Sequence, residues 1–155
     1  MKLDRTDRRI LQLMQRNARI SNLELAEQVG LSPTPCSRRV KRLEQSGLIE
    51  AHVTVLNQSL LGLKLTVIIG ITMDRHTPDR FANFEAQVQQ FPEVIECSIV
   101  TGQSADYLLK AVLPDMEGYE AFLLGRLTRI EGVTGVHSSF VLRRVIDKTE
   151  LPLLQ

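Results

Sequence analysis

The sequence SNLELAEQVGLSPTPCSRRVKRLEQSG, residues 21–47, decides the fold of the N-terminal part of the chain. Ser21 and Glu24 have the spacing of a capping box, in which each side chain accepts a hydrogen bond from the other residue's backbone at a helix start. Gly30 suits the left-handed conformation that ends helices, and the Ser-Pro pair at residues 32–33 can begin the next helix almost at once. Two helices joined by so short a turn predict a helix-turn-helix, although an ordinary helical hairpin gives the same signals.

The second of these helices favours the helix-turn-helix because its two sides differ in chemistry. At about 100° per residue, Cys36, Val40 and Leu43 fall on one stripe and are expected to pack inward. The opposite side carries hydroxyl, arginine and lysine side chains, which can contact base edges and phosphates in a major groove. Arg39 leans toward the packed side, so we interpret it as structural or as facing a phosphate. The residues that we predict to contact DNA are Ser32, Thr34, Pro35, Ser37, Arg38, Lys41 and Arg42.

Regular elements are also expected on both sides of this pair of helices. Asp4 can cap a preceding helix whose apolar stripe includes Ile10. On the other side, the alternation of Ala51, Val53 and Val55 with other residues predicts a strand directly after the third helix. The N-terminal part is therefore predicted to be a winged helix-turn-helix.

The charge distribution supports nucleic-acid binding by the same part of the chain. The net charge of the 155 residues is only +1, which by itself predicts no partner. Residues 1–50, however, hold ten basic and six acidic side chains, a net +4, whereas residues 51–155 hold nine and twelve, a net −3. This asymmetry indicates a basic reader joined to a neutral or acidic partner domain.

The rest of the chain, after a connector at residues 56–63, is expected to contain four strands and two helices. The expected elements are a strand at 65–73, a helix opened by Thr77-Pro78-Asp79, strands at 94–100 and 107–113, a helix opened by Pro114-Asp115, and a strand at 133–145. The order βαββαβ predicts a ferredoxin-like domain, and the fold class is α+β. Helices would cover one face of this sheet only, and neither face of the first strand carries a charge, so we expect a homodimer through the other face.

Composition, cysteines and histidines exclude several other classes of protein. Values of 43% hydrophobic and 24% charged residues are ordinary for a globular chain, and the apolar run 65–73 is too short to cross a bilayer. The first ten residues are too charged for a signal peptide, so we expect a cytoplasmic protein with no membrane partner. Cys36 and Cys97 are expected to be buried thiols, and the three histidines lack metal-ligand spacing. We therefore predict no metal, no cofactor and no enzymatic activity; an enzyme with a ferredoxin-like catalytic half is the least favoured alternative.

Motifs along essentially the whole chain resemble those of one family. They are Arg19-Ile20-Ser21-Asn22, Glu24-Leu25, the run 29–36, the run 39–44, Glu96-Cys97, the run 106–110, Pro114-Asp115-Met116, Tyr119, Ser138-Ser139-Phe140 and the tail 149–153. In this order they are similar to the Lrp/AsnC (feast/famine, leucine-responsive) transcription regulators. The resemblance implies a sequence-specific regulator that binds double-stranded DNA. It also implies a C-terminal domain that binds an amino acid and assembles homodimers into tetramers or octamers.

The resemblance further implies a domain division and an effector site. The domains are a helix-turn-helix at 1–50, a connecting strand and linker at 51–63, and an effector-binding and oligomerisation domain at 64–155. The implied effector residues are Gly102, Gln103, Asp106, Tyr107, Ser138 and Ser139. Three residues stand between Gly102 and Asp106, where the family usually has two. Because the added residue can reshape the effector site, we expect a small or aliphatic amino acid and name no single one. Two alternatives stay open: Gly102 and Asp106 only shape a turn, or the chain is a metabolite-binding assembly module that no longer contacts DNA.

Overall fold

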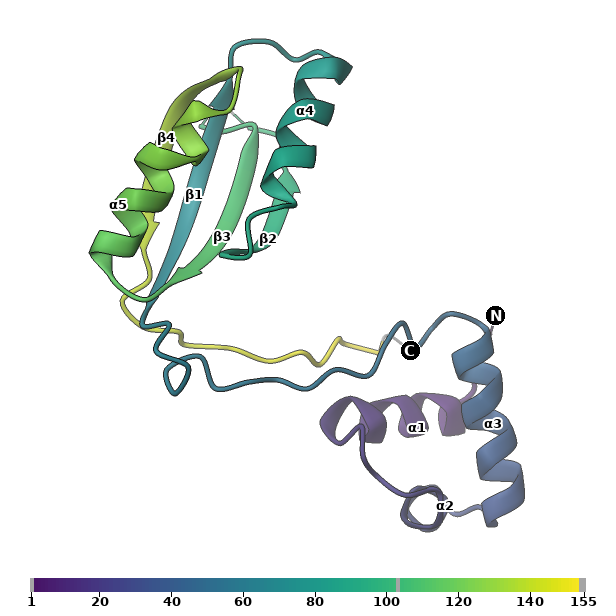
Figure 1. Cartoon of the computed structure of the whole chain (residues 1–155). Helices are drawn as coiled ribbons and strands as arrows, with labels where there is room; N and C mark the ends of the chain where they lie inside the picture. The colour runs from purple at the N-terminus through teal and green to yellow at the C-terminus, as the bar shows by residue number, and fades with distance from the viewer. Residues whose placement is uncertain (1, 103, 154–155) are drawn as a thin grey trace. The chain divides into compact units, whose positions relative to one another are not determined.

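The computed structural model describes residues 2–102 and 104–153 and divides the chain into two units (Figure 1). One unit holds the residues up to 55 together with those from 146 onward, and the other holds residues 56–145. The elements of the first unit are α1 (Arg5–Arg16), α2 (Asn22–Val29) and α3 (Pro33–Gln45). Those of the second are β1 (Leu65–Met73), α4 (Pro78–Val88), β2 (Val94–Ile99), β3 (Tyr107–Leu113), α5 (Met116–Gly125), a 3₁₀ turn η1 (Leu127–Arg129) and β4 (Val133–Phe140).

The predicted helix ends of the first unit are confirmed. The Asp4 carboxylate accepts from the N–H of Asp7 at the start of α1, and Ser21 and Glu24 form the expected capping box at the start of α2. Helix α2 ends at Gly30, whose φ of +69° is left-handed. Ser32 occupies the N-cap of α3, but its side chain makes no capping hydrogen bond, so its hydroxyl is available to a partner. The ends of the helices are thus set by local sequence, as their signals indicated.

The predicted strand after α3 is wrong. Residues 51–57 pair with no strand in the described ranges, and the side chains of Val53 and Val55 are 73% and 77% exposed. A strand needs a neighbour that accepts and donates its backbone hydrogen bonds, and among residues 2–102 and 104–153 no strand pairs with this segment. The expected domain 64–155 stays a prediction; in the structure the residues from 146 onward group with the helices of the first unit.

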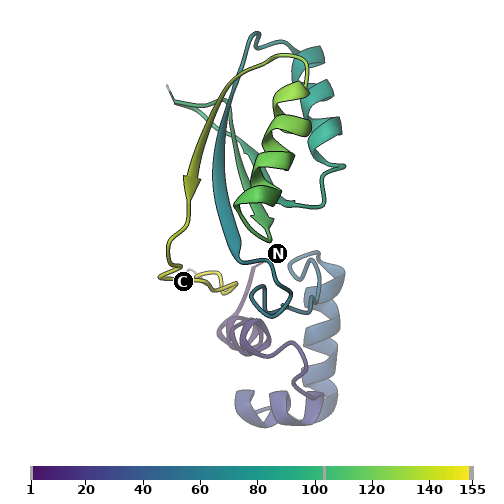
Figure 2. The same ribbon diagram turned by 60° about the vertical axis from the view of Figure 1, so that its left-hand side comes forward.

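The second unit has the predicted βαββαβ order. Its sheet is antiparallel with strand order β2-β3-β1-β4, and α4 and α5 lie on the same face of it (Figures 1 and 2). Strand β4 stops at Phe140 rather than at residue 145. The reason is its neighbour, because Phe140 pairs with Val67 and the N–H of Val141 bonds to Thr66, almost at the first residue of β1.

The two faces of the sheet differ in what covers them. On the helix-covered face, Val67, Ile69 and Ile71 are fully buried and belong to a cluster with Phe84 and Phe122. The other face, which we call the open face, carries the alternate residues, among them Ile68, Gly70 and Leu108, the last 41% exposed.

The two cysteines have different surroundings. Cys36 is buried in the helical core, as predicted, and burial raises the pKa of its thiol. The prediction of burial is wrong for Cys97, which is exposed because β2 is an edge strand of the sheet.

Candidate nucleic-acid interface and ligand site

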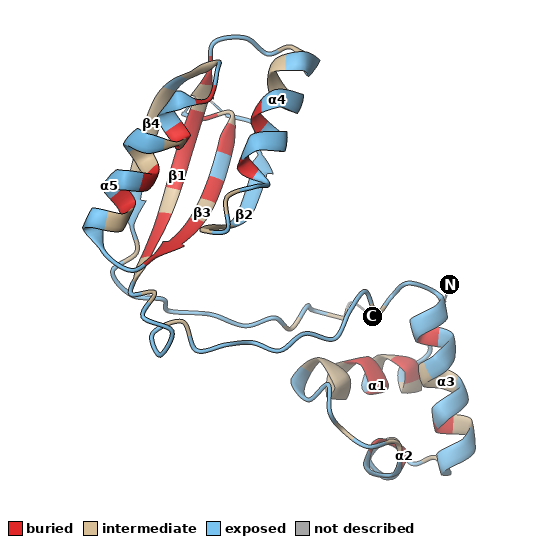
Figure 3. Cartoon of the chain, in the orientation of Figure 1, coloured by how far each residue is buried: buried red, intermediate tan, exposed pale blue. Residues whose placement is uncertain are grey.

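The outward side of α3 is a polar surface with room for a ligand. Thr34, Ser37, Arg38 and Lys41 are all exposed, whereas Cys36 on the opposite side is fully buried (Figure 3). Within residues 2–102 and 104–153, neither Arg38 nor Lys41 forms an ion pair. Both cationic groups are therefore free to bind a base edge or a phosphate. Pro35, also predicted to contact DNA, is half-buried in the first turn of α3.

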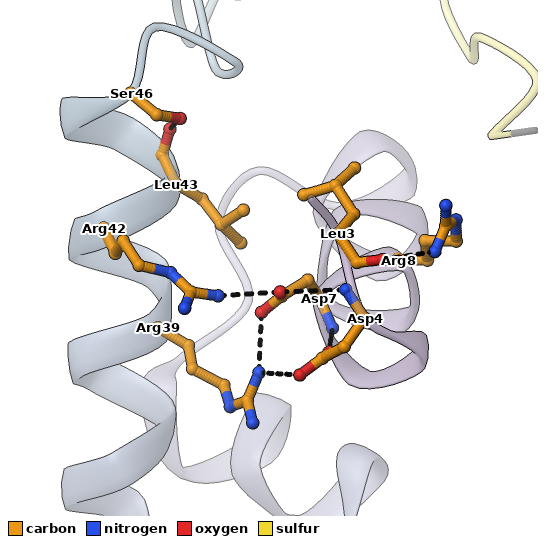
Figure 4. Close-up of polar contacts among 8 residues, drawn as sticks. All are labelled: Leu3, Asp4, Asp7, Arg8, Arg39, Arg42, Leu43 and Ser46. Carbon is orange, nitrogen blue, oxygen red and sulfur yellow. Dashed lines mark hydrogen bonds and ion pairs between the residues drawn. The ribbon is translucent and has the colours of Figure 1, made fainter. Parts of the chain in front are cut away.

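A buried carboxylate fixes this helix against α1. The side chain of Asp7 is only 1% exposed and lies between two arginines of α3 (Figure 4). Arg39 Nη1 is 2.8 Å from Asp7 Oδ1 and 2.6 Å from Asp4 Oδ2, and Arg42 Nη2 is 2.7 Å from Asp7 Oδ2. We call these four residues the aspartate clamp. The structural interpretation of Arg39 is confirmed.

The clamp gives Arg42 a partner within the protein. Its Nη2 is turned to Asp7, whose buried carboxylate would be unfavourable without a partner, while the side chain is still 51% exposed, so its contact with DNA stays a prediction. The sequence held two signals for the clamp. Arg42 follows Arg39 by three residues and so lies on the same side of α3, and the aspartates at 4 and 7 have the spacing of a capping box.

Hydrogen bonds in the clamp also shift the pKa values of two of its residues, Asp4 and Arg39. The N–H of Asp7 and the Arg39 guanidinium hold the pKa of the Asp4 carboxyl below its usual value of 3.8. Conversely, the two aspartates raise the pKa of Arg39. Asp4 and Arg39 are therefore both charged at neutral pH.

The loop between β2 and β3 is fastened to the end of β1. Asp106 Oδ2 accepts from the N–H of Met73 at 2.7 Å, and Asp106 Oδ1 lies 2.8 Å from His76 Nε2. Its backbone N–H also donates to the carbonyl of Ile71. These contacts favour the turn-shaping alternative for Asp106 over a carboxylate reserved for a ligand. His76 was not singled out in the sequence as part of this site.

The same loop runs against the open face of the sheet. A Cβ added at Gly70 would meet the Cβ of Ala105 at 3.3 Å, so loop and strand approach closely there. Gly102 has a φ of +146°, which favours glycine, and nothing lies within 4 Å of a Cβ placed on it. Its backbone is therefore accessible. Gln103 lies outside the described residues.

The two predicted serines of β4 point to opposite faces. Ser139 pairs with Ile68, is exposed and belongs to the open face. Ser138 pairs with Ile69 on the helix-covered face, where its hydroxyl bonds to that of Tyr119. Alternation along a strand allows only one of them in a site on either face, and Ser139 shares its face with the loop.

Tyr107 is separated from these groups. It is 1% exposed, its ring lies 4.6 Å from that of Phe84, and its hydroxyl donates to Glu85 at 2.6 Å. Burial, together with Glu85, raises the pKa of the phenol. This side chain is a core residue of the second unit, and its contact with the effector stays a prediction.

Both halves of the chain match known domains. Residues 3–50 match the winged helix-turn-helix DNA-binding domain, and residues 66–151 match the Lrp/AsnC ligand-binding domain. The chain belongs to the Lrp/AsnC family. It is accordingly a transcription regulator with an N-terminal DNA-binding domain and a C-terminal domain that binds an amino acid.

Lrp/AsnC relatives resemble the chain over nearly its full length. The leucine-responsive regulatory protein of Salmonella typhimurium is 44% identical over 149 residues, 96% of this chain and 90% of that protein. A transcriptional regulator from Neisseria meningitidis, crystallised as a complex with L-Met, is 40% identical with a TM-score of 0.93, covering 97% of both chains. An AsnC family regulator from Agrobacterium tumefaciens is 37% identical with a TM-score of 0.91, again over 97% of both chains.

Other kinds of site were sought in the part of the chain that the structure describes. No group of three or more histidine, cysteine, aspartate or glutamate side chains there could hold a metal ion. None of the helices described is long and apolar enough to cross a membrane. The Lrp/AsnC relatives are regulators and point to no catalytic family.

Proposed function

We propose that the outward side of α3 reads one half-site of a DNA operator in the major groove, and that a small amino acid bound beside the β2–β3 loop changes DNA affinity or assembly. The observation that carries the first part is the pair of exposed, unpaired cations Arg38 and Lys41 on a helix fixed by the aspartate clamp. A rigid helix with free polar groups on one side is what direct readout of base edges requires.

The side chains on this surface have separable roles. Arg38 has the two parallel N–H groups that recognise O6 and N7 of guanine. Lys41, one turn further, is a compact cation suited to a phosphate. Thr34 and Ser37 supply short hydroxyls, and the uncapped hydroxyl of Ser32 can donate to the backbone of the duplex. Arg42 helps to hold α3 in place through its ion pair with Asp7 of α1.

The effector site proposed for the second unit is narrower than the set of residues predicted from the sequence. It comprises the accessible backbone at Gly102, which can approach a carboxylate closely, and the Ser139 hydroxyl on the face that the loop contacts. Asp106 holds the loop in place through Met73 and His76. The Neisseria relative bound to L-Met supports a small or aliphatic amino acid as the effector.

Self-association supplies the link between this ligand and DNA. The open face includes Ile68 and the 41% exposed Leu108 with no helix over it, so we propose that it pairs with a second copy of the chain. Because the β2–β3 loop lies against that face, a ligand there borders the interface and favours one assembly over another. Such a dimer presents two α3 helices to a pseudo-palindromic site.

A gel-shift titration of the full chain on the DNA upstream of its own gene tests this function, with and without L-methionine and L-leucine. We expect specific binding that at least one amino acid changes. Arg38→Ala should weaken the specific complex on the order of 10-fold to 100-fold. Arg75→Ala is the matched control, because it removes an exposed arginine from the other unit. Amino-acid binding without any DNA complex would instead support the assembly module that no longer contacts DNA.

A further inference from the structure

The last described residues of the chain dock on α1, on a part of it that α3 does not use. The Gln15 side-chain amide holds the backbone of Leu151 at two points, accepting from its N–H at 2.6 Å and donating to its carbonyl at 3.2 Å. Next to it, Arg16 Nε lies 3.2 Å from Glu150 Oε1. Leu153 packs against the hydrophobic core of the helical unit. Backbone, charge and apolar contacts therefore hold four consecutive residues, 150–153.

This docking uses the backbone of Leu151 and the side chains of Glu150 and Leu153. The Leu151 side chain is 73% exposed and contributes little, whereas both of its backbone polar groups are bonded. The partners are separated by more than 130 positions in the sequence, so the contact is a tertiary one and not a product of local chain stiffness. Because these contacts are not part of the hydrogen bonding within α1, residues 150–153 can dissociate from α1 and bind it again while the helix stays folded.

Helix α1 contacts both the docked segment and the recognition helix. Near its start Asp7 holds Arg39 and Arg42 of α3, and near its end Gln15 and Arg16 hold residues 150–153. Because both sets of contacts are made by the same helix, we expect the position of residues 150–153 to affect α3 through α1. A groove of about 720 Å³ lies beside the docked segment and is lined by residues of α1, the end of α2 and the tail.

The chain also connects this segment to the proposed effector site. Strand β4 carries Ser139 and ends at Phe140. The path from Phe140 to Glu150 has no regular secondary structure apart from bends, and Leu142 and Val145 on it are 98% and 81% exposed. Residues 141–149 therefore join the end of β4 directly to the docked residues, and on this path the Arg144 guanidinium donates to the side chain of Gln58.

We propose that residues 150–153 are a latch through which amino-acid binding beside β4 changes the presentation of α3 to DNA. Docked on Gln15 and Arg16, the latch holds α1 and α3 in one arrangement. Released, it leaves the helical unit tethered to the sheet only through residues 51–63. This inference rests on the proposed function, because it assigns the route by which the ligand of one unit affects the DNA contact of the other.

The test uses the full chain and four variants, with L-methionine and L-leucine as probes. Arg16→Glu sets two carboxylates against each other, and Gln15→Ala removes both bonds to the Leu151 backbone. Adding Glu150→Arg to Arg16→Glu restores the ion pair with its charges exchanged. Leu151→Ala is the matched control, since that side chain is exposed. Hydrogen exchange of the tail and of α1, and the ratio of DNA Kd values with and without amino acid, are measured for each.

In the wild type we expect the amino acid to change tail exchange and to shift the DNA Kd by about 5-fold to 150-fold, the usual range of coupling between sites. Arg16→Glu and Gln15→Ala should expose the tail to exchange and bring the Kd ratio to about one, meaning that coupling is lost. The exchanged pair should restore the ratio, and Leu151→Ala should match the wild type.

Two results would overturn the latch. One is an unchanged Kd ratio in Arg16→Glu and Gln15→Ala, and the other is tail exchange in the wild type that neither amino acid alters. Either leaves the proposed function standing if wild-type DNA binding is seen in the same titration. A wild type that binds no DNA refutes the proposed function instead, and the exchange of the tail still decides whether the latch responds to a ligand.

Discussion

Removal of Asp7 and removal of its arginines should have unequal effects on stability, although both abolish the two ion pairs of Asp7; removal of the arginines also abolishes the Arg39–Asp4 pair. Replacing Arg39 and Arg42 by Met keeps their stems but leaves a carboxylate that is 1% exposed and, among the described residues, retains the N–H of Asp4 as its one donor. Stranding a buried charge in this way costs about 3–5 kcal/mol. Asp7→Ala instead frees two guanidiniums whose side chains are 30% and 51% exposed, and one keeps Asp4. Hydrated cations leave a smaller loss, about 1.5–3 kcal/mol.

This difference predicts that the change in the free energy of unfolding caused by Asp7→Ala has opposite signs in two backgrounds. Asp7→Ala should destabilise the wild type but stabilise the Arg39→Met/Arg42→Met chain by about 1–2 kcal/mol, because it removes the stranded charge. Urea unfolding followed by far-ultraviolet circular dichroism measures the free energies of unfolding, and hydrogen exchange of α1 and α3 assigns them to the helical unit. Arg38→Met is the control, since it removes an exposed, unpaired arginine from the same helix and should change stability by less than about 0.5 kcal/mol. If Asp7→Ala destabilises both backgrounds equally, the clamp does not hold α3 as described.

Three further perturbations test other parts of the structure. Gly30→Ala should lower the free energy of unfolding of the helical unit, measured in urea, by about 1 kcal/mol, because φ is +69° at this position. An unchanged free energy would show that residue 30 does not adopt the left-handed conformation. The pKa values of Asp4 and Glu24 are lowered by their capping hydrogen bonds, so their stabilisation is present above the ordinary values of 3.8 and 4.5 and is lost as the pH falls through the folded-state values. Helical circular dichroism should therefore fall on acidification, and an Asp4→Asn/Glu24→Gln chain with the same acid dependence as the wild type would contradict this. In a thermal-shift titration with L-methionine, Ser139→Ala should reduce the ligand-induced rise in Tm more than Ser138→Ala, and the reverse order would place the ligand on the other face.

The sequence was sufficient for elements whose limits are set by neighbours in the chain. Capping residues such as Ser21 and Glu24 bond to the backbone three positions away, so their spacing alone identifies a helix start. The run 65–73 carries no charged residue on either face, and it forms a central strand with a neighbour on each side. The outward side of α3 was also predictable, because helical periodicity fixes which residues lie opposite Cys36.

Features that depend on distant partners were not predictable in the same way. Arg42 lies at the border of the polar side of α3, and only the packing of α1 decides that it turns to Asp7. The segment 51–55 alternates like a strand, but no strand pairs with it in the part of the chain that the structure describes. The docking of residues 150–153 on α1 joins the two ends of the chain, and no local pattern encodes such a contact.

The effector residues show a third kind of limit. Similarity to a family transfers adjacent positions together, but adjacent positions on a strand face opposite ways, so Ser138 and Ser139 separate in the structure. Tyr107 follows Asp106 in the sequence, yet it begins β3 and points into the core.

The most direct measurement of the central claim, that the outward side of α3 enters duplex DNA, is fluorescence anisotropy on one operator over a series of salt concentrations. Lys41→Ala should weaken binding to specific and unrelated DNA alike and reduce the salt slope by about one, as expected for one lost phosphate contact. Arg38→Ala should weaken the specific complex by about 1–3 kcal/mol and relax the preference for a single base pair. Unchanged affinity, slope and preference in both variants would show that this side of α3 does not contact DNA.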